Sequence, residues 1–472
     1  MTRAGAARWE QLVERWRGRA EPPRARDAWF VAAAALGVRV LVVLGAATRF
    51  PPADDGAFYH VVASRIARGL GYTWLWPDGA VTYAAHYPVG YPALIGAFYA
   101  LIGAVPAVAM GVNAVVGAVA AFSAHALAGR TGSRRGALLA GLCVAFEPAL
   151  VLYTPALMTE AVAGELLLVA TALATAPRPS ATWRAVLASL VLGLALLVRP
   201  QLLLVTPFVG ALVAWRSADA RASVRAACAV TALAVTVCVP WTLRNCARLD
   251  TCAFVSANGG WNLFIGSSPV GEGGWAPLER IGVPTACRAV FGEGEKDRCF
   301  GRAGVAVIAE HPLAWLALAP KKLAVTFDYG TAAAHYLATS NPTLVTESVK
   351  TAIGALELFG QRVLLVAASL ALGFVAGPRS VLRRRLTPVG VVLALVPFAW
   401  TAWLCLVVQG LALGRALTRL PSVLLAVATV ATTAFTHAVF FGAGRYALVC
   451  VPALATLAGL LGGAPAKDAA EA

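Results

Sequence analysis

The stretch Ala53-Asp54-Asp55-Gly56-Ala57-Phe58-Tyr59-His60 comes directly after the first long apolar segment of the chain. Two adjacent carboxylates therefore stand where a membrane helix would emerge into water. Asp55 and Tyr59 are four positions apart, so the spacing predicts an amphipathic helix that begins with its acids at the membrane surface. Ionisable groups at such a place require water, a cation or another partner. The alternative interpretation is a solvated N-terminal cap of an interfacial helix.

The composition is typical of an integral membrane protein. Hydrophobic residues make up 59% of the chain and charged residues 13%, whereas soluble domains contain about 25% charged residues. Apolar runs close to the roughly 20 residues that cross a bilayer recur from residue 28 to residue 462. The sequence therefore predicts an all-α polytopic membrane protein with about 11 to 13 transmembrane helices.

The formal net charge of +16 comes mainly from clusters of arginine at the ends of apolar segments. The clusters are Arg3 to Arg26 before the first span, Arg130 with Arg134 and Arg135, Arg216 with Arg221 and Arg225, and Arg383 to Arg385. Short basic loops mark the cytoplasmic side of a membrane protein. We therefore expect a cytoplasmic N-terminus in the cell (inner or plasma) membrane, no nucleic-acid partner, and no cleavable signal peptide.

The pattern of apolar and polar segments predicts five parts. These are a basic N-terminal segment (1–27), an N-terminal transmembrane catalytic module (28–242) containing the first external loop (49–106), an external loop with an interfacial stretch (243–355), C-terminal helices (356–462), and a tail (463–472). Residues 91–104 are apolar but short, so we expect an interfacial helix there. To keep Arg385 inside and Arg445 outside, the 387–411 region must contain an extra crossing or a re-entrant piece. In the first span, Arg39 is expected to pair with an acid inside the bundle.

The cysteines agree with this sidedness. Five fall in apolar spans, where cysteine behaves as a small hydrophobic residue. Four fall in the external loop, and an even number in an oxidising compartment predicts disulfides, although four cysteines allow three connectivities. Nearness in sequence favours the pairs Cys246–Cys252 and Cys287–Cys299. The alternatives are reduced thiols and, with less support from the spacing, a zinc site.

A series of motifs follows the acidic helix along the chain. They are His86-Tyr87-Pro88-Val89-Gly90-Tyr91-Pro92, Thr159-Glu160, Leu197-Val198-Arg199-Pro200, Pro240-Trp241 with Arg244-Asn245, Ser256 to Leu263, and Gly444-Arg445-Tyr446. In their order and sidedness these motifs resemble the GT-C class of membrane glycosyltransferases. Within that class they resemble the family-39-like group of protein O-mannosyltransferases and the lipid A aminoarabinose transferase.

The resemblance implies a GT-C bundle and transfer of a hexosyl or pentosyl group, with inversion, from a polyprenyl-phosphate donor on the non-cytoplasmic face. The acceptor would be an envelope glycan, lipid or protein, and membrane lipids would be the other partners. It places the catalytic carboxylate at Asp55, beside Asp54, with Glu160 as the second acid. The family commonly has Asp-Glu where this chain has Asp55-Gly56, which leaves open which of the two aspartates acts.

The chemistry explains these residue types. An acceptor hydroxyl or amine needs a carboxylate to take its proton, and a leaving phosphate needs cationic stabilisation, for which arginine is well suited. We expect Arg244, Arg199 and Arg445, in that order, to bind the donor phosphate. Tyr59, His86 and Tyr87 are candidates for substrate contact. Asp54, Asp55, His86 and Glu160 are compatible with a divalent cation, but the sequence does not establish metal dependence.

The main competing class is a transporter or flippase of a lipid-linked substrate, which would also be polytopic with intramembrane charges. Such a protein commonly has two related halves, and none is evident in the sequence. It also has less need of a folded external loop of about seventy residues. A receptor or scaffold would not require clustered external acids and arginines. The sequence therefore favours the enzyme.

Overall fold

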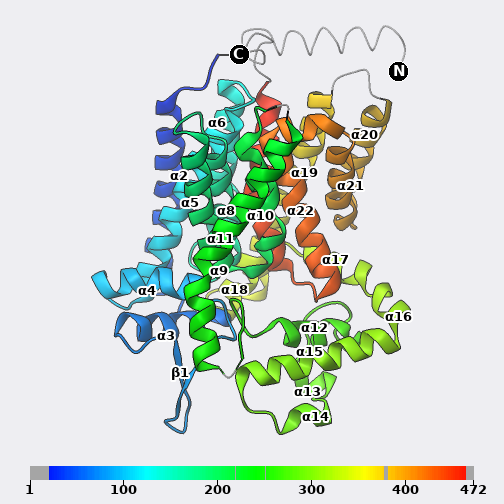
Figure 1. Cartoon of the computed structure of the whole chain (residues 1–472). Coiled ribbons are helices and arrows are strands. Elements are labelled where there is room, and N and C mark those ends of the chain that lie inside the picture. The colour runs from blue at the N-terminus through cyan, green and yellow to red at the C-terminus, as the bar shows by residue number, and fades with distance from the viewer. Residues whose placement is uncertain (1–20, 218, 250, 377–380, 464–472) are drawn as a thin grey trace.

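The computed structural model describes residues 21–217, 219–249, 251–376 and 381–463, without the side chains of 381–384. The predicted basic segment before residue 21 and the tail beyond residue 463 lie outside this range. A helical bundle forms one end of the molecule, and smaller helices with one hairpin cover the other end (Figure 1).

Eight helical segments within the described part are long and apolar enough to cross a membrane. They are α2 (Ala25–Ala46), α5 (Pro106–Ala128), α6 with α7 (Arg134–Leu152), α9 (Ala181–Val198), α11 (Ala220–Arg248), α19 (Glu347–Ala376), α22 (Pro421–Val439) and the segment Gly444–Gly462, which comprises η5 (Gly444–Cys450), α23 (Val451–Gly459) and η6 (Leu460–Gly462). Among these, α5 packs against α2, α6 and α23. The fold is the expected polytopic helical one.

Within the described residues, the helices long and apolar enough to span number eight, or nine if one bent pair counts as a span, against the 11 to 13 transmembrane helices expected. Several apolar helices are too short to cross. They are α8 (Glu160–Ala174), α10 (Thr206–Ala211) between η1 (Pro200–Leu204) and η2 (Leu212–Ala214), α20 (Val381–Leu395) and α21 (Trp400–Leu411). Apolar composition alone does not distinguish such half-length helices from spans, because both are built mainly of apolar residues.

Helices α20 and α21 occupy the region in which the sequence predicts an extra crossing or a re-entrant piece between Arg385 and Arg445. Both helices are shorter than a span, they pack against each other, and α20 also packs along α19. In Figure 1 they lie together in the half of the bundle farther from the small helices. They form a helical hairpin, the shape that a re-entrant piece would have, followed by η4 (Gly414–Arg419) and α22.

The first loop that the sequence predicts to be external forms α3 (Asp55–Ala67), a hairpin and α4 (Gly90–Ile102). In Figure 1, α3 and α4 lie across the end of the bundle rather than along it. Antiparallel strands β1 (Thr73–Leu75) and β2 (Val81–Tyr83) project beyond them. The hairpin turn places Gly79 at φ 87°, a conformation that glycine adopts without steric cost. The short apolar segment is thus a helix too short to span and oriented across the bundle end, the form expected of an interfacial or half-embedded segment.

The second of the two predicted external loops lies beside the first at the same end of the molecule (Figure 1). Its helices are α12 (Gly259–Ser267), η3 (Pro269–Gly271), α13 (Leu278–Ile281), α14 (Thr285–Arg288) and α15 (Glu293–Glu310), and the chain then returns through α16 (Pro312–Ala317), α17 (Ala319–Phe327) and α18 (Ala332–Ser340). Disulfides join Cys246 to Cys252 and Cys287 to Cys299, the pairs that sequence proximity favours. Phe264, Cys287 and Phe300 form the small core of this part.

Candidate functional site

The acids and arginines singled out in the sequence lie where the bundle meets the external helices. Asp55 begins α3, Glu160 begins α8, Arg199 ends α9, and Arg445 is the second residue of η5. A helix N-terminus favours an anion because its first N–H groups and its dipole point toward it. Two of these ends are marked in the sequence, since η5 begins at Gly444 and Pro200 follows Arg199 at the end of α9.

Asp55 is the acid that faces the opening of the site. One carboxylate oxygen accepts a hydrogen bond from the Tyr87 hydroxyl at 2.8 Å, and the other accepts from Arg445 Nη2 at 2.8 Å. Its side chain is 21% exposed. Burial and the adjacent Asp55 carboxylate raise the pKa of Tyr87 well above its ordinary range. Tyr87 therefore remains protonated and donates to Asp55.

Glu160 is the buried acid of the site, and it binds several of the surrounding side chains. Its side chain is 2% exposed and accepts hydrogen bonds from Arg199 Nη1 at 2.8 Å and Tyr153 Oη at 3.1 Å. Arg445 Nε lies 3.3 Å from the same carboxylate. Buried carboxylates require such compensation, because an unpaired charge away from water is very costly. Arg445 thus bridges Asp55 and Glu160.

The ring of Tyr446 makes cation–π contacts with both Arg199 and Arg445. The Arg199 guanidinium carbon lies 5.0 Å from the ring centroid and that of Arg445 lies 5.6 Å from it. Guanidinium groups are attracted to the face of an aromatic ring at such distances. His437 stacks on the same ring with centroids 4.2 Å apart. The ring and the shared Glu160 carboxylate thus offset the repulsion between the two neighbouring cations.

Arg445 offers the better phosphate contact of these two arginines. Arg199 uses Nη1 for Thr159 and Glu160, and its remaining N–H groups face Gln201, whose amide oxygen accepts from Nε and Nη2 at 3.1 Å each when the amide is turned. Within the described residues, the ion pairs of Arg445 are made through Nε and Nη2. Arg445 Nη1 is therefore available to an incoming anion.

Asp54 points away from this cluster. Its backbone has φ 50° and ψ −135°, which is outside the left-handed helical region and uncommon for a residue other than glycine. Its side chain is 37% exposed and lies 3.8 Å from His335 Nε2. Because the chain reverses at Asp54, the adjacent carboxylates of Asp54 and Asp55 reach different partners.

Arg244, the first choice for phosphate from the sequence, has other partners. It donates to the backbone oxygens of Tyr72 at 2.7 Å and Ala84 at 2.9 Å, and its guanidinium carbon lies 4.6 Å from the Trp241 ring centroid. These contacts hold the base of the β1–β2 hairpin against α11. Within the described ranges, the hydrogen bonds of Arg244 go to Ala84, Tyr72 and Asn245, and none joins it to Asp55, Glu160 or Arg445.

Aromatic side chains form one wall beside Asp55. The Tyr59 ring lies 5.4 Å from Tyr87 and 5.6 Å from Tyr91, measured between centroids, in edge-on contacts. His86 lies between Tyr87 at 4.8 Å and Trp261 at 5.5 Å. Burial lowers the pKa of His86, although the Asp297 and Asp55 carboxylates act in the opposite direction.

Two acids of α15, Glu293 and Asp297, form hydrogen bonds with the backbone beside the aromatic side chains His86 and Trp261. Glu293 accepts from the backbone N–H of Ala85 at 2.9 Å, and Asp297 accepts from that of Trp261 at 2.8 Å. Burial raises the pKa of both carboxyls above their ordinary values, and the backbone hydrogen bonds oppose that rise. The backbone just before Tyr87 is therefore anchored to the disulfide-bonded loop.

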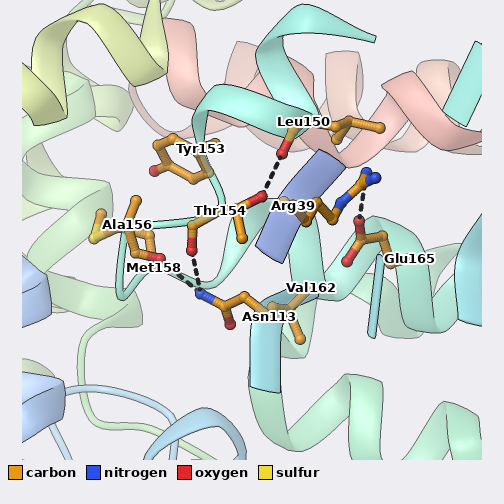
Figure 2. A pocket seen from close by; sticks show the side chains of 10 residues that line it. Arg39, Asn113, Leu150, Tyr153, Thr154, Ala156, Met158, Val162 and Glu165 are labelled. Atoms are coloured by element: carbon orange, nitrogen blue, oxygen red, sulfur yellow. Dashed lines mark hydrogen bonds and ion pairs between the residues drawn. The ribbon is translucent and has the colours of Figure 1, made fainter. Parts of the chain in front are cut away.

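A small cavity lies behind Glu160, inside the bundle (Figure 2). Asn113 Nδ2 donates to the carbonyls of Thr154 at 3.1 Å and Ala156 at 3.0 Å, which ties the segment before Glu160 to α5. On the far side of the cavity Arg39 Nη2 lies 3.8 Å from Glu165. Arg39 thus pairs with an acid inside the bundle, Glu165, as its position in the first span predicted.

Few side chains that could bind a metal ion lie close together in the described structure. Within the described ranges, no group of three or more histidine, cysteine, aspartate or glutamate side chains is placed to hold an ion. Asp54 and Asp55 face different ways, and His86 belongs to the aromatic wall. The four residues considered as ligands from the sequence therefore do not converge, and no step below depends on a metal.

Three tyrosines of the site have no role in the sequence analysis. Tyr153 donates to Glu160, Tyr446 lies beneath both arginines, and Tyr336 contacts the segments that precede the two acids. Tyr446 follows Arg445 directly, so its motif contained the signal. For Tyr336 the sequence around α18 gives no indication, because its partners are distant in the chain.

Comparison with known proteins gives structural similarity only. No protein-family model and no curated protein sequence matches the chain. Among solved structures, it is similar to the archaeal oligosaccharyltransferase AglB from Archaeoglobus fulgidus in complex with an inhibitory peptide and a dolichol-phosphate, at 12% identity and a TM-score of 0.46, covering 92% of this chain and 49% of that one. It is also similar to ArnT from Cupriavidus metallidurans bound to undecaprenyl phosphate, at 16% identity and a TM-score of 0.39, covering 90% and 77%.

Both are GT-C glycosyltransferases, the class that the motifs of this chain resemble. The chain spans about half the length of the archaeal oligosaccharyltransferase. Because the identities and TM-scores are low, the function proposed below is argued from the contacts of the site.

Proposed function

We propose that this protein is a membrane glycosyltransferase that moves a sugar from a polyprenyl-phosphate donor to an envelope acceptor on the non-cytoplasmic face. The observation that carries the proposal is the pair Asp55–Arg445. A partly exposed carboxylate and an arginine with a free Nη1 meet at 2.8 Å, above a buried second acid. General-base chemistry and stabilisation of a leaving phosphate require these two kinds of group side by side.

In the proposed reaction, Asp55 accepts the proton of the acceptor hydroxyl or amine as that atom attacks the anomeric carbon. The bond between the anomeric carbon and the phosphate oxygen breaks, and polyprenyl phosphate leaves with its negative charge. Attack opposite the leaving group inverts the configuration. Arg445 stabilises the phosphate, Arg199 and Tyr153 keep Glu160 in place, and Tyr87 orients Asp55.

The test compares a deletion strain with the same strain carrying the wild-type gene. We expect mass spectrometry of envelope glycans, lipids and proteins to show one sugar substituent that is lost on deletion and restored by the gene. Membranes from the complemented strain, supplied with the lipid extract of the deletion strain, should release polyprenyl phosphate in proportion to the substituent formed. A lipid-linked sugar that crosses the membrane without being transferred would instead identify a transporter, and would refute the proposal.

The orientation is tested by the disulfides. We expect Cys287→Ser to leave the Cys299 thiol free and reactive toward a membrane-impermeant maleimide added to intact spheroplasts, because the loop lies outside. The matched control is Ser217→Cys, an exposed position between η2 and α11 at the opposite end of the bundle. It should react only after the membrane is opened. The reverse pattern would overturn the sidedness and the proposed location of the site.

A further inference from the structure

Tyr336 links the two chain segments that deliver the acids. It lies on α18 with 2% of its surface exposed. Its hydroxyl oxygen accepts from the backbone N–H of Ala53 and from that of Leu157, each at 3.3 Å. Ala53 is two residues before Asp55, and Leu157 is three residues before Glu160. A single oxygen atom therefore connects the start of α3 with the start of α8.

The helix that carries Tyr336 is itself fixed on two sides. Ser340 Oγ donates to the carbonyl of Pro51 at 2.6 Å, and Asn341 Nδ2 donates to that of Arg49 at 2.8 Å. At its other end, the Glu357 carboxylate of α19 accepts from the N–H groups of Ala333 and Ala334, each at 2.9 Å. The phenol is thus presented from a rigid support rather than from a mobile loop.

Gly56 provides the space for this contact. A Cβ atom built on Gly56 would lie 2.8 Å from Tyr336 Oη and 3.1 Å from the carbonyl oxygen of Leu157. Both distances are shorter than ordinary van der Waals contact, so any side chain would push the tyrosine or the α8 segment away. Gly56 lies within α3, so its backbone angles do not require glycine. Glycine is required here because there is no room for a side chain. This accounts for the departure from the Asp-Glu pattern of the resembled family.

From these contacts we propose that Tyr336, accommodated by Gly56, is a positioning residue that sets the separation of Asp55 and Glu160 so that Arg445 bridges both. This inference rests on the proposed function. The bridge requires Arg445 Nη2 at 2.8 Å from one acid and Nε at 3.3 Å from the other. A misplacement of about 1 Å in such an arrangement lowers rates by about a hundredfold.

The first test is Tyr336→Phe, which keeps the ring and removes the acceptor oxygen. We expect turnover to fall by about tenfold to a hundredfold, with the KM for the lipid-linked donor changed less than twofold, because the donor contacts are kept. Amide hydrogen exchange should rise in the peptides covering both 50–57 and 154–160. The matched control is Tyr99→Phe, which removes a hydroxyl that contacts His60 on α3; it should leave turnover and both peptides unchanged.

The second test is the pair Gly56→Ala and Tyr336→Phe, alone and combined. Gly56→Ala alone should lower turnover because its methyl group meets the Tyr336 hydroxyl. In the Tyr336→Phe background, the same change should cost a smaller factor, since that hydroxyl is gone. A multiplicative combination of the two losses would refute the contact, and so would a Tyr336→Phe protein with wild-type turnover and exchange.

The hydrogen-exchange measurement needs no sugar substrate, so it separates the two proposals. If the wild-type protein transfers no sugar but Tyr336→Phe releases both peptides together, the glycosyltransferase assignment fails and the link between the segments stands. If the wild-type enzyme is active, Asp55→Asn is inactive and Tyr336→Phe matches the wild type, the positioning role fails and the function stands.

Discussion

Replacing Asp55 with asparagine should abolish sugar transfer, with a loss of about 10²- to 10⁴-fold, the typical contribution of general acid–base catalysis. Asparagine keeps the size of the side chain and accepts from Tyr87 through its amide oxygen, but it cannot take the proton of the acceptor. The measurement is the initial rate of polyprenyl phosphate release in membranes containing equal amounts of folded enzyme.

Asp54→Asn is the comparison variant, because it removes the neighbouring carboxylate that faces His335. Asparagine also tolerates the positive φ of this position. We expect a much smaller loss for this variant. If Asp54→Asn were inactive and Asp55→Asn active, the assignment of the base would be wrong by one residue. If both variants kept full activity, this loop would not be the catalytic one.

Replacing Arg445 with glutamine should produce the second largest loss, about 10²- to 10³-fold, as for the removal of one group that stabilises developing negative charge. The change also leaves Asp55 and Glu160 without the cation between them, so the two carboxylates repel each other. The measurement is turnover and donor KM at increasing concentrations of the lipid-linked donor.

Arg445→Lys separates these two effects. Lysine keeps the positive charge but cannot reach two carboxylates and an anion at once, because it lacks the planar fork of the guanidinium group. We expect Arg445→Lys to recover part of the activity lost in Arg445→Gln. Equal, near-normal rates for both variants would show that Arg445 does not contact the phosphate.

The sequence predicts the parts of this site that depend on local pattern. Asp55, Glu160 and Arg445 stand at the ends of apolar segments, and sidedness alone brings them to one end of the bundle. The disulfide pairs follow from short separations in the loop. Such features need only the period of the apolar residues and the position of the charges.

The remaining features depend on tertiary contacts. Arg244 has the same local pattern as a phosphate ligand, yet the nearby hairpin supplies carbonyls that satisfy it. Tyr336 acts on partners 283 and 179 positions away, which no spacing rule detects. The sequence predicts more transmembrane helices than the described residues have helices of spanning length, because half-length helices are as apolar as full spans.

The ion pairs of the site also imply an order of events during biogenesis. Glu160 and Arg199 are 39 positions apart, so the buried acid acquires its first cation soon after it is synthesised. Asp55 and Arg445 are 390 positions apart. At about 5–20 residues per second, synthesis separates them by about 20 to 80 s. Until the last span is inserted, the nascent chain contains the base without its cation, so a ribosome-bound or truncated chain would be unable to act on lipid-linked sugar in the same membrane.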